Sequence, residues 1–373
     1  MLIIKSDSIF ALKDGLAKEF SSPFALEKYE KEKRFFENNS WRGGNDDDGN
    51  PAALMSRQML WGARAARRAP RKPRMKFVQR VNERYYYVLE LSQASGLFYF
   101  DLLKNEEIRL FHREVFSPRG VHVADDYGAV TTVQDEDGSS HIVRLDAEGR
   151  QVKQLTSGDC IDENPFLDGN TILYQSSGIA RTQEGIAAVF APAEILRLHL
   201  ETGSIETVKA YREFDCLLPK ADGKGAVYYI KTPYQSGQVS MGTHLLDFVL
   251  FPYRLAIAIL AFLNVFSLFF AKRPLKTSGG PDLAGIDLTK RLLHNKVVDI
   301  QQTMRKEGKH VAAPREWKLI RLIDGAEEEL ATNVLWYDVN KEGKIIYTDG
   351  FSVFDGERKK IYQSEELVTL VGH

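Results

Sequence analysis

The amino-acid sequence predicts an all-β protein: a six-bladed β-propeller closed by N- and C-terminal strands in one blade, with helical insertions on one face. Three observations predict it. An alternating two-strand motif recurs along the chain, a second strand pair precedes most copies, and the two chain ends carry complementary halves of one unit. Recurring units of four antiparallel strands are typical of propeller blades.

The recurring motif is an apolar strand, a short polar turn that usually holds Gly with Asp or Glu, and a second alternating strand. These are the features of a β-hairpin. Its six copies are residues 8–22, 96–112, 141–157, 194–210, 317–332 and 351–364. A second strand pair is expected at residues 75–91, 120–134, 160–177, 216–232 and 335–350.

The two ends of the chain are expected to share one blade. The hairpin in residues 1–21 has no inner strand before it, and the apolar strand in residues 366–373 has no hairpin after it. Joining them completes a four-stranded sheet and removes two exposed strand edges. We therefore expect the propeller to comprise residues 1–21, 75–177, 194–235 and 316–373.

Residues 152–177 resemble the TolB-like repeat, which is also called the PD40 or WD40-like repeat. The matching residues are Gln154, Leu155, Thr156, Asp162, Pro165, Asp168, Gly169, Ile172, Tyr174 and Ser176. The resemblance implies the propeller fold. It also implies that the domain is either a protein-binding platform or an appendage to an enzyme, because such propellers mostly serve these roles.

Composition restricts the class and the location of the protein. With 373 residues, 43% of them hydrophobic, and a net charge of −1, the chain is globular and not uniformly basic, so nucleic acid is an unlikely partner. Two cysteines cannot build a disulfide framework and suit a reducing compartment. The first residues alternate as a strand does, so no signal peptide is expected. We expect a location at the cytoplasmic side of the membrane, peripheral or monotopic.

Three stretches interrupt the blade pattern. They are a helical and basic insertion at 22–74, a short loop insertion at 178–193, and a hydrophobic, membrane-associating helical insertion at 236–315. If the strands of each blade are labelled A to D from the centre of the propeller outward, the first insertion joins strand D of one blade to strand A of the next. The other two insertions join strands B and C of their own blades. Because strand direction alternates, all three should emerge on one face.

The third insertion contains 17 consecutive uncharged residues, 255–271, which is just long enough to cross a hydrocarbon core of about 30 Å. Its flanking strands belong to one blade, and the only return path, 275–315, is rich in charges. A single crossing is therefore excluded, and the segment is expected to dip into one leaflet, to lie in the interface or to pack into the membrane region of a partner. The residues predicted to contact the membrane are Phe248, Leu250, Phe251, Tyr253, Leu255, Ile257, Leu260, Phe262, Phe266, Phe269 and Phe270.

Basic residues flank this apolar segment and fill a predicted helix at 51–69, a composition typical of interfacial membrane helices. A solvated basic linker is the alternative for 51–69. The residues expected to meet lipid headgroups are Arg57, Arg64, Arg67, Arg68, Arg71, Lys72, Arg74, Lys272, Arg273 and Lys276. A further amphipathic helix is expected at 282–306.

The chain contains no phosphate-binding loop, nucleophile elbow, zinc-protease motif or Cys-x-x-Cys pair. Cys160 and Cys216 each follow an aspartate, and the favoured interpretation is two small buried residues rather than a metal or redox pair. No cofactor and no metal are expected. The polar residues predicted to line the propeller channel are His122, Asp162, Asp215, Asp338 and His373.

These observations favour a non-catalytic propeller that acts as a binding or adaptor platform for a membrane protein or a lipid. Two alternatives remain open. One is a propeller enzyme with a central-channel site, such as a metal-dependent hydrolase similar to the lactonases. The other is a soluble oligomer that uses residues 248–271 as its contact. Enzymatic activity stays uncertain, with the sequence favouring its absence.

Overall fold

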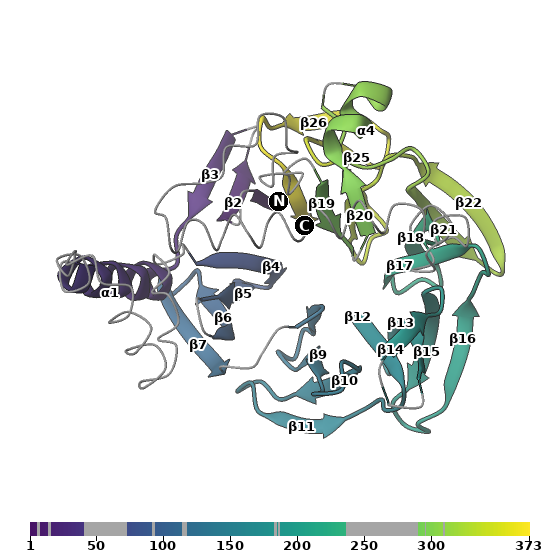
Figure 1. Cartoon of the computed structure of the whole chain (residues 1–373), viewed down its shortest axis with the longest axis horizontal. Helices are drawn as coiled ribbons and strands as arrows, with labels where there is room; N and C mark the ends of the chain where they lie inside the picture. The colour runs from purple at the N-terminus through teal and green to yellow at the C-terminus, as the bar shows by residue number, and fades with distance from the viewer. Residues whose placement is uncertain are drawn as a thin grey trace, which may run out of the picture. The chain divides into compact units, whose positions relative to one another are not determined.

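The computed structural model describes residues 1–5, 8–13, 16–40, 73–91, 94–113, 118–182, 185, 187–235, 290–294, 296–308 and 310–373. The chain divides into two units. The first holds Met1–Lys31, Pro70–Ser236 and Thr289–His373, and the second holds Glu32–Ala69 and Gly237–Leu288. The first unit is an all-β propeller, in which four-stranded sheets follow one another around a common centre (Figure 1).

All the described strands except β14, β19 and β20 pair in six groups of four. The first group is β27 (Val368–Gly372), β1 (Leu2–Lys5), β2 (Ser8–Lys13) and β3 (Leu16–Phe20). The second is β4 (Arg74–Val81), β5 (Arg84–Glu90), β6 (Ser95–Asp101) and β7 (Glu106–Arg113). The third is β8 (Val121–Val123), β9 (Ala129–Gln134), β10 (Ser140–Leu145) and β11 (Gln151–Gln154).

The fourth group is β12 (Cys160–Asp168), β13 (Thr171–Arg181), β15 (Glu194–His199) and β16 (Ile205–Lys209). The fifth is β17 (Phe214–Ala221), β18 (Val227–Pro233), β21 (Lys318–Ile323) and β22 (Ala326–Ala331). The sixth is β23 (Trp336–Val339), β24 (Ile345–Thr348), β25 (Ser352–Asp355) and β26 (Lys360–Gln363). The first strand in each group is strand A of the expected register.

The two ends of the chain share a sheet, as predicted. Strand β1 pairs with β27 in antiparallel register, with Ile3 opposite Val371 and Ile4 opposite Leu370. The side chains of Ile3 and Val371 are buried in one apolar cluster with Val368. This pairing satisfies the backbone of both terminal strands, because each would otherwise present an open edge.

One connection between sheets was not expected. Residues Ser140 of β10 and Ile161 of β12 form a single parallel bridge, which joins the third and fourth groups into one nine-stranded sheet. The ninth strand is β14 (Ala187–Phe190), which pairs with the end of β13.

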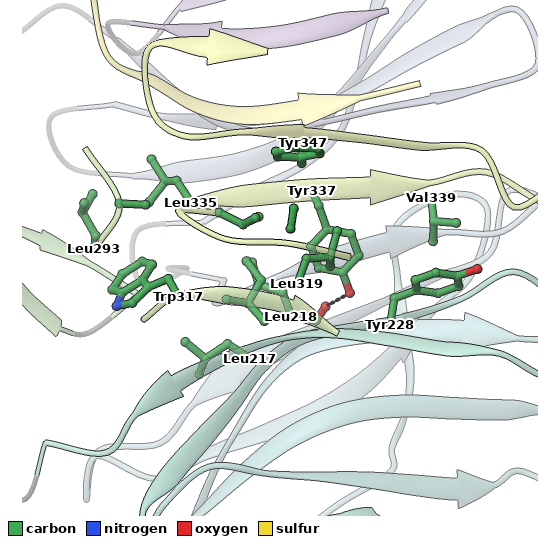
Figure 2. Close-up of a cluster of buried hydrophobic side chains, with 14 of the residues drawn as sticks. Leu217, Leu218, Tyr228, Leu293, Trp317, Leu319, Leu335, Tyr337, Val339 and Tyr347 are labelled. Atoms are coloured by element: carbon green, nitrogen blue, oxygen red, sulfur yellow. Dashed lines mark hydrogen bonds between the residues drawn. The ribbon is translucent and has the colours of Figure 1, made fainter. Parts of the chain in front are cut away.

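The core lies between adjacent sheets, and its largest cluster is packed between the fifth group and the sixth. Figure 2 shows Leu218 of β17, Leu319 of β21 and Tyr337 of β23 converging there. The Tyr337 hydroxyl donates a hydrogen bond to the Leu218 carbonyl at 2.6 Å. Successive side chains of a strand point to opposite faces of its sheet, and both faces of the fifth sheet are buried: Tyr228 packs toward the sixth sheet and Tyr229 toward the fourth.

The first insertion begins with a helix, α1 (Pro23–Ser40), in agreement with the predicted helical content of 22–74. Ser22 precedes it, and its hydroxyl accepts a hydrogen bond from the Ala25 amide at 3.1 Å. Glu107 of β7 accepts the Phe24 amide at 2.7 Å and also binds the Ser22 hydroxyl. Pro23 suits the first turn, because its missing N–H would have no partner there. These contacts fix the start of α1 to the second sheet.

The other two insertions differ from expectation. Residues 178–193 are not simply a loop, because β13 extends to Arg181 and pairs with β14. Residues 290–307 do not continue one amphipathic helix. They form the hairpin of β19 (Lys290–Leu293) and β20 (Lys296–Asp299), followed by the short helix α4 (Ile300–Glu307). The helix begins at Asp299, whose carboxylate accepts the Gln302 amide at 2.8 Å.

Two features explain why residues 290–299 form a hairpin instead of a helix: the conformation of the turn and the burial of apolar side chains. His294 adopts a φ of 48°, which breaks a helix, and the β-branched Val298 is buried in the large core cluster together with Leu293. Tertiary burial of these alternating positions thus overrides the helical spacing seen in the sequence. Within the described residues, no helix is both long and apolar enough to span a membrane. The predicted membrane-contacting residues lie outside the described residues, as do all the predicted headgroup-binding residues except Arg74, which begins β4.

Candidate functional site

A cavity of about 950 Å³ runs along the centre of the propeller. Strand A of every group contributes to its wall: β4, β8, β12, β17, β23 and β27. One end is formed by the turns that join strand A to strand B, which include Asp125, Gly169, Gly223 and Lys341. We call this end the A–B face. The three insertions leave the propeller at the other end of the strands, because they follow strand B or strand D.

Two neighbouring inner strands share an irregularity that shapes the cavity wall. Asn164 of β12 has a φ of 50° and Leu218 of β17 has a φ of 56°, and each precedes a proline. The strand register shifts at both points. Such bulges redirect the side chains that follow them. Gln175 holds the two bulges together, since its Oε1 accepts the Asn164 amide group at 3.0 Å and the Leu218 backbone N–H at 2.9 Å.

Beyond the second bulge, Lys220 reaches across the cavity wall to the sixth sheet. Its ammonium group lies 2.5 Å from Asp338 Oδ1. The other carboxylate oxygen of Asp338 accepts the His373 backbone N–H at 2.8 Å. Burial raises the pKa of Asp338, but the charge of Lys220 and these hydrogen bonds outweigh it, and the pKa is lowered overall. Asp338 is therefore an ionised, fully engaged carboxylate at neutral pH.

His122 of β8 also lines the cavity. Its Nδ1 accepts the Leu167 backbone N–H at 3.1 Å, and its ring lies 4.3 Å from that of Phe166, measured between centroids. Burial, with a further contribution from the charge of Lys220, lowers the pKa of His122 to about 3. The ring is therefore neutral at physiological pH and carries its proton on Nε2.

Three of the five predicted channel residues, His122, Asp338 and His373, line the cavity, and two do not. Asp162 accepts the Ser176 hydroxyl at 2.7 Å and lies between the third and fourth sheets. Asp215 accepts the Ala193 amide at 2.7 Å and pairs with Lys296 of the β19–β20 hairpin. Both residues precede the bulges, at the end of the inner strands away from the A–B face. Partners in neighbouring elements therefore bind them outside the cavity.

Lys220, Asn164 and Trp336 also line the cavity and were not predicted from the sequence. In both "ENPFLDG" and "LLPKADG", a proline lies three residues before the aspartate of an Asp-Gly turn. This shared pattern was the available signal for Asn164 and Lys220. It was not decisive, because a one-residue bulge reverses the direction of every side chain after it. Trp336 is apolar and fits the strand alternation as any core residue would, so no local signal marked it as a cavity residue.

The cavity suits recognition by hydrogen bonds, ion pairs and ring stacking. Its described lining residues include no Ser, Thr, Tyr or Cys side chain that could act as a nucleophile. Several carboxylates at the A–B face are already engaged. Asp222 accepts the Lys224 amide at 2.8 Å, Asp126 accepts the Gly128 amide at 3.0 Å, and Asp125 pairs with Lys341. The wall thus carries charges of both signs, several of them engaged in ion pairs or hydrogen bonds, rather than a field of one sign.

The lowered pKa of Asp338 makes a prediction for stability. Because its pKa is lower in the folded than in the unfolded state, ionised Asp338 stabilises the fold above the unfolded pKa, at about pH 4. That contribution is lost as the pH falls through the folded pKa. We expect the wild type to lose its stability advantage over Asp338→Asn between neutral and strongly acidic pH, measured by urea unfolding at a series of pH values. Asp125→Asn, which alters an exposed pair, is the control; an equal pH dependence there would contradict the assignment.

Comparisons with known proteins concern the fold. No protein-family model matches the sequence, and no curated protein matches it significantly. Among solved structures, the chain is similar to TolB from Acinetobacter baumannii, with 11% identity and a TM-score of 0.40 over 80% of this chain and 58% of that chain.

It is also similar to the β-propeller domain of the Trilobed protease from Pyrococcus furiosus, with 10% identity and a TM-score of 0.38 over 78% of this chain and 84% of that chain. A structure of a nidogen/laminin complex matches with 11% identity and a TM-score of 0.47 over 100% and 96% of the two chains. The chain spans 31% of the tricorn protease, another similar structure, and 58% of TolB. By its strand pairing the chain is a β-propeller, and the similar structures include the TolB propeller that residues 152–177 resemble.

Proposed function

We propose that this protein is a non-catalytic, membrane-associated β-propeller that binds a partner through the A–B face of its central cavity. The observation that carries the binding role is the cavity itself, whose wall is drawn from all six strand groups and whose described lining offers paired charges, amides and rings but no hydroxyl or thiol nucleophile. Concave sites of this size with a few placed polar groups are where proteins bind ligands.

Membrane attachment rests on the sequence of the third insertion. Its 17 uncharged residues, 255–271, follow strand β18 and precede the β19–β20 hairpin, and basic residues follow the apolar run directly. An exposed apolar segment of this length is costly in water and is stabilised by lipid or by another protein. Because the insertions leave the propeller at the end opposite the A–B face, anchorage leaves that face accessible. We place the propeller on the cytoplasmic leaflet, where anionic lipids attract the basic residues.

Flotation with lipid vesicles tests the attachment. We expect the full chain to float with phosphatidylcholine vesicles, and more completely when phosphatidylglycerol is added. A variant lacking residues 243–276 should stay at the bottom of the gradient while keeping the far-ultraviolet spectrum of the propeller. If the full chain instead remains unbound and purifies without detergent as a defined oligomer, the apolar segment is a contact between copies and the membrane role is wrong.

The binding role is tested separately with the full chain, extracted in mild detergent and captured with its membrane partners. Lys224→Glu and Lys341→Glu change the charge of the A–B face, and Lys153→Glu on the outer strand β11 is the matched control. A partner that is lost from both A–B variants and kept by the control supports recognition at the cavity. Partners retained by all three variants would place recognition elsewhere on the molecule, whatever the flotation result.

A further inference from the structure

A trio of side chains with metal-ligand chemistry lies between the third and fourth sheets, away from the central cavity. One ring nitrogen of His141, the Cys160 sulfur and one carboxylate oxygen of Asp162 all lie within 4.8 Å of one another. It is the only such trio of His, Cys, Asp or Glu residues in the part of the chain that the structure describes. We propose that these three residues bind a divalent ion of borderline softness, such as Zn²⁺.

The backbone brings the three residues together. Cys160 and Asp162 are two positions apart on β12, so their side chains lie on the same face of the strand. His141 belongs to β10, directly after Ser140, which forms the parallel bridge to Ile161. The Ser140 hydroxyl also donates to the Asp162 carbonyl at 2.9 Å, which fixes the two strands to each other at this level. The unexpected bridge between the two sheets therefore positions the trio.

The histidine is oriented as a metal ligand would be. Its Nε2 lies 3.3 Å from Asp135 Oδ2, whereas its Nδ1 is buried and has no hydrogen-bond partner. The residue is only 5% exposed. Metal-binding histidines commonly donate one ring N–H to a carboxylate and offer the other nitrogen to the ion. A buried ring nitrogen without a partner is otherwise costly, so the arrangement points to a missing ligand.

The other two ligands fit the same ion. Asp162 is 2% exposed, and the Ser176 hydroxyl donates to its Oδ1 at 2.7 Å, which orients the carboxylate. Cys160 is a free, half-buried thiol. Nitrogen, sulfur and oxygen donors together suit Zn²⁺ rather than Ca²⁺ or Mg²⁺, which prefer oxygen alone. Tetrahedral zinc needs ligand atoms about 3.5 Å apart, so small side-chain rotations close the present spacing.

Charged contacts tie the segments around the trio to one another. Arg181 Nη2 lies 2.9 Å from Asp137 Oδ2, and Arg181 Nε lies 2.7 Å from Asp159 Oδ1. Asp137 follows Asp135 in the turn before β10, and Asp159 directly precedes Cys160. Arg181 thus connects the two segments that supply His141 and Cys160. Three protein ligands leave one coordination position of a tetrahedral ion for water or for a donor from a partner.

Metal titration of the purified full chain tests the site. We expect one equivalent of Zn²⁺ to bind in competition with a chromophoric chelator, and Co²⁺ to give a thiolate-to-metal charge-transfer band. Cys160→Ser and His141→Gln should abolish that equivalent. Cys216→Ala, which removes the other thiol, and His199→Gln, an exposed histidine, should leave it unchanged. Asp135→Asn, which removes only the carboxylate behind the histidine, should weaken binding about 10–100-fold.

Two readouts on the wild type need no variant. Saturating Zn²⁺ should slow alkylation of Cys160, located by mass spectrometry, and the Co²⁺ spectrum should show the thiolate band. A Co²⁺ complex without that band, or alkylation of Cys160 that is unchanged by Zn²⁺, would overturn the proposal. So would an equivalent that survives in folded Cys160→Ser protein, with folding confirmed by its thermal unfolding curve.

Discussion

Replacing Tyr337 by alanine is expected to lower the free energy of unfolding by about 3–5 kcal/mol, the range found when large buried aromatic side chains are truncated. Tyr337 has no solvent-exposed surface and lies at the centre of the largest apolar cluster, between the fifth and sixth sheets (Figure 2). Its removal leaves a cavity between two sheets that can close only if both strands shift. The Leu218 carbonyl also loses its hydrogen-bond donor.

Tyr337→Phe separates the two contributions. It keeps the ring and removes only the hydroxyl, so the loss should be about 1–3 kcal/mol, as for one buried hydrogen bond left unpaired. Urea unfolding followed by fluorescence measures both variants. Tyr362→Ala, a half-buried tyrosine on the outer strand β26, is the matched control. A loss for Tyr337→Ala no greater than that of this control would contradict the assigned role of the interface.

Replacing Lys296 by methionine is expected to destabilise the fold by about 3–5 kcal/mol, because it leaves a buried carboxylate without its counter-charge. The side chains of Lys296 and Asp215 are 7% and 10% exposed, and Lys296 also donates to the Pro233 carbonyl at 2.7 Å. The pair joins the β19–β20 hairpin to β17 and the end of β18. The hairpin should therefore loosen first, with faster hydrogen exchange in residues 290–299.

The double variant Asp215→Asn with Lys296→Met tests the cause. If the uncompensated charge dominates, the double variant should recover much of the stability lost by Lys296→Met alone. The exposed pair of Lys341 and Asp125, whose side chains are 79% and 70% exposed, is the control, and Lys341→Met should have little effect. A double variant as unstable as the single one would show instead that the contact with Pro233 carries the stabilisation.

Local sequence was enough to predict the repeats, because alternation and turn chemistry act over a few residues. The strand pairs in residues 160–177 and 216–232, the closure of residues 1–21 by residues 366–373, and the helix after Ser22 all follow from such local signals. The helix predicted at 282–306 was wrong over residues 290–299, which form a hairpin, and agrees with the structure over 300–306, which lie in α4. In residues 290–299, burial of Leu293 and Val298 against the propeller core selected a hairpin over a helix.

The candidate sites depend on contacts between residues far apart in the chain. Lys220 and Asp338 are separated by 118 positions, and Lys296 and Asp215 by 81. Neither pairing leaves a local pattern. Asp162 and Asp215 were predicted to line the channel because they lie on inner strands. Asp162 instead lies beside His141 and Cys160, and Asp215 pairs with Lys296.

The all-β repeat, the positions of its turns and the sharing of one blade by the two chain ends could be predicted from the sequence, because period-two alternation and glycine-containing turns are properties of short segments. Which polar side chains meet depends on the folded arrangement of the strands. The bulges at Asn164 and Leu218 and the bridge between Ser140 and Ile161 select those partners. A proline follows each bulge and is a local signal, but the residues that the bulges and the bridge bring together belong to strands far apart in the sequence, so no short segment encodes those contacts.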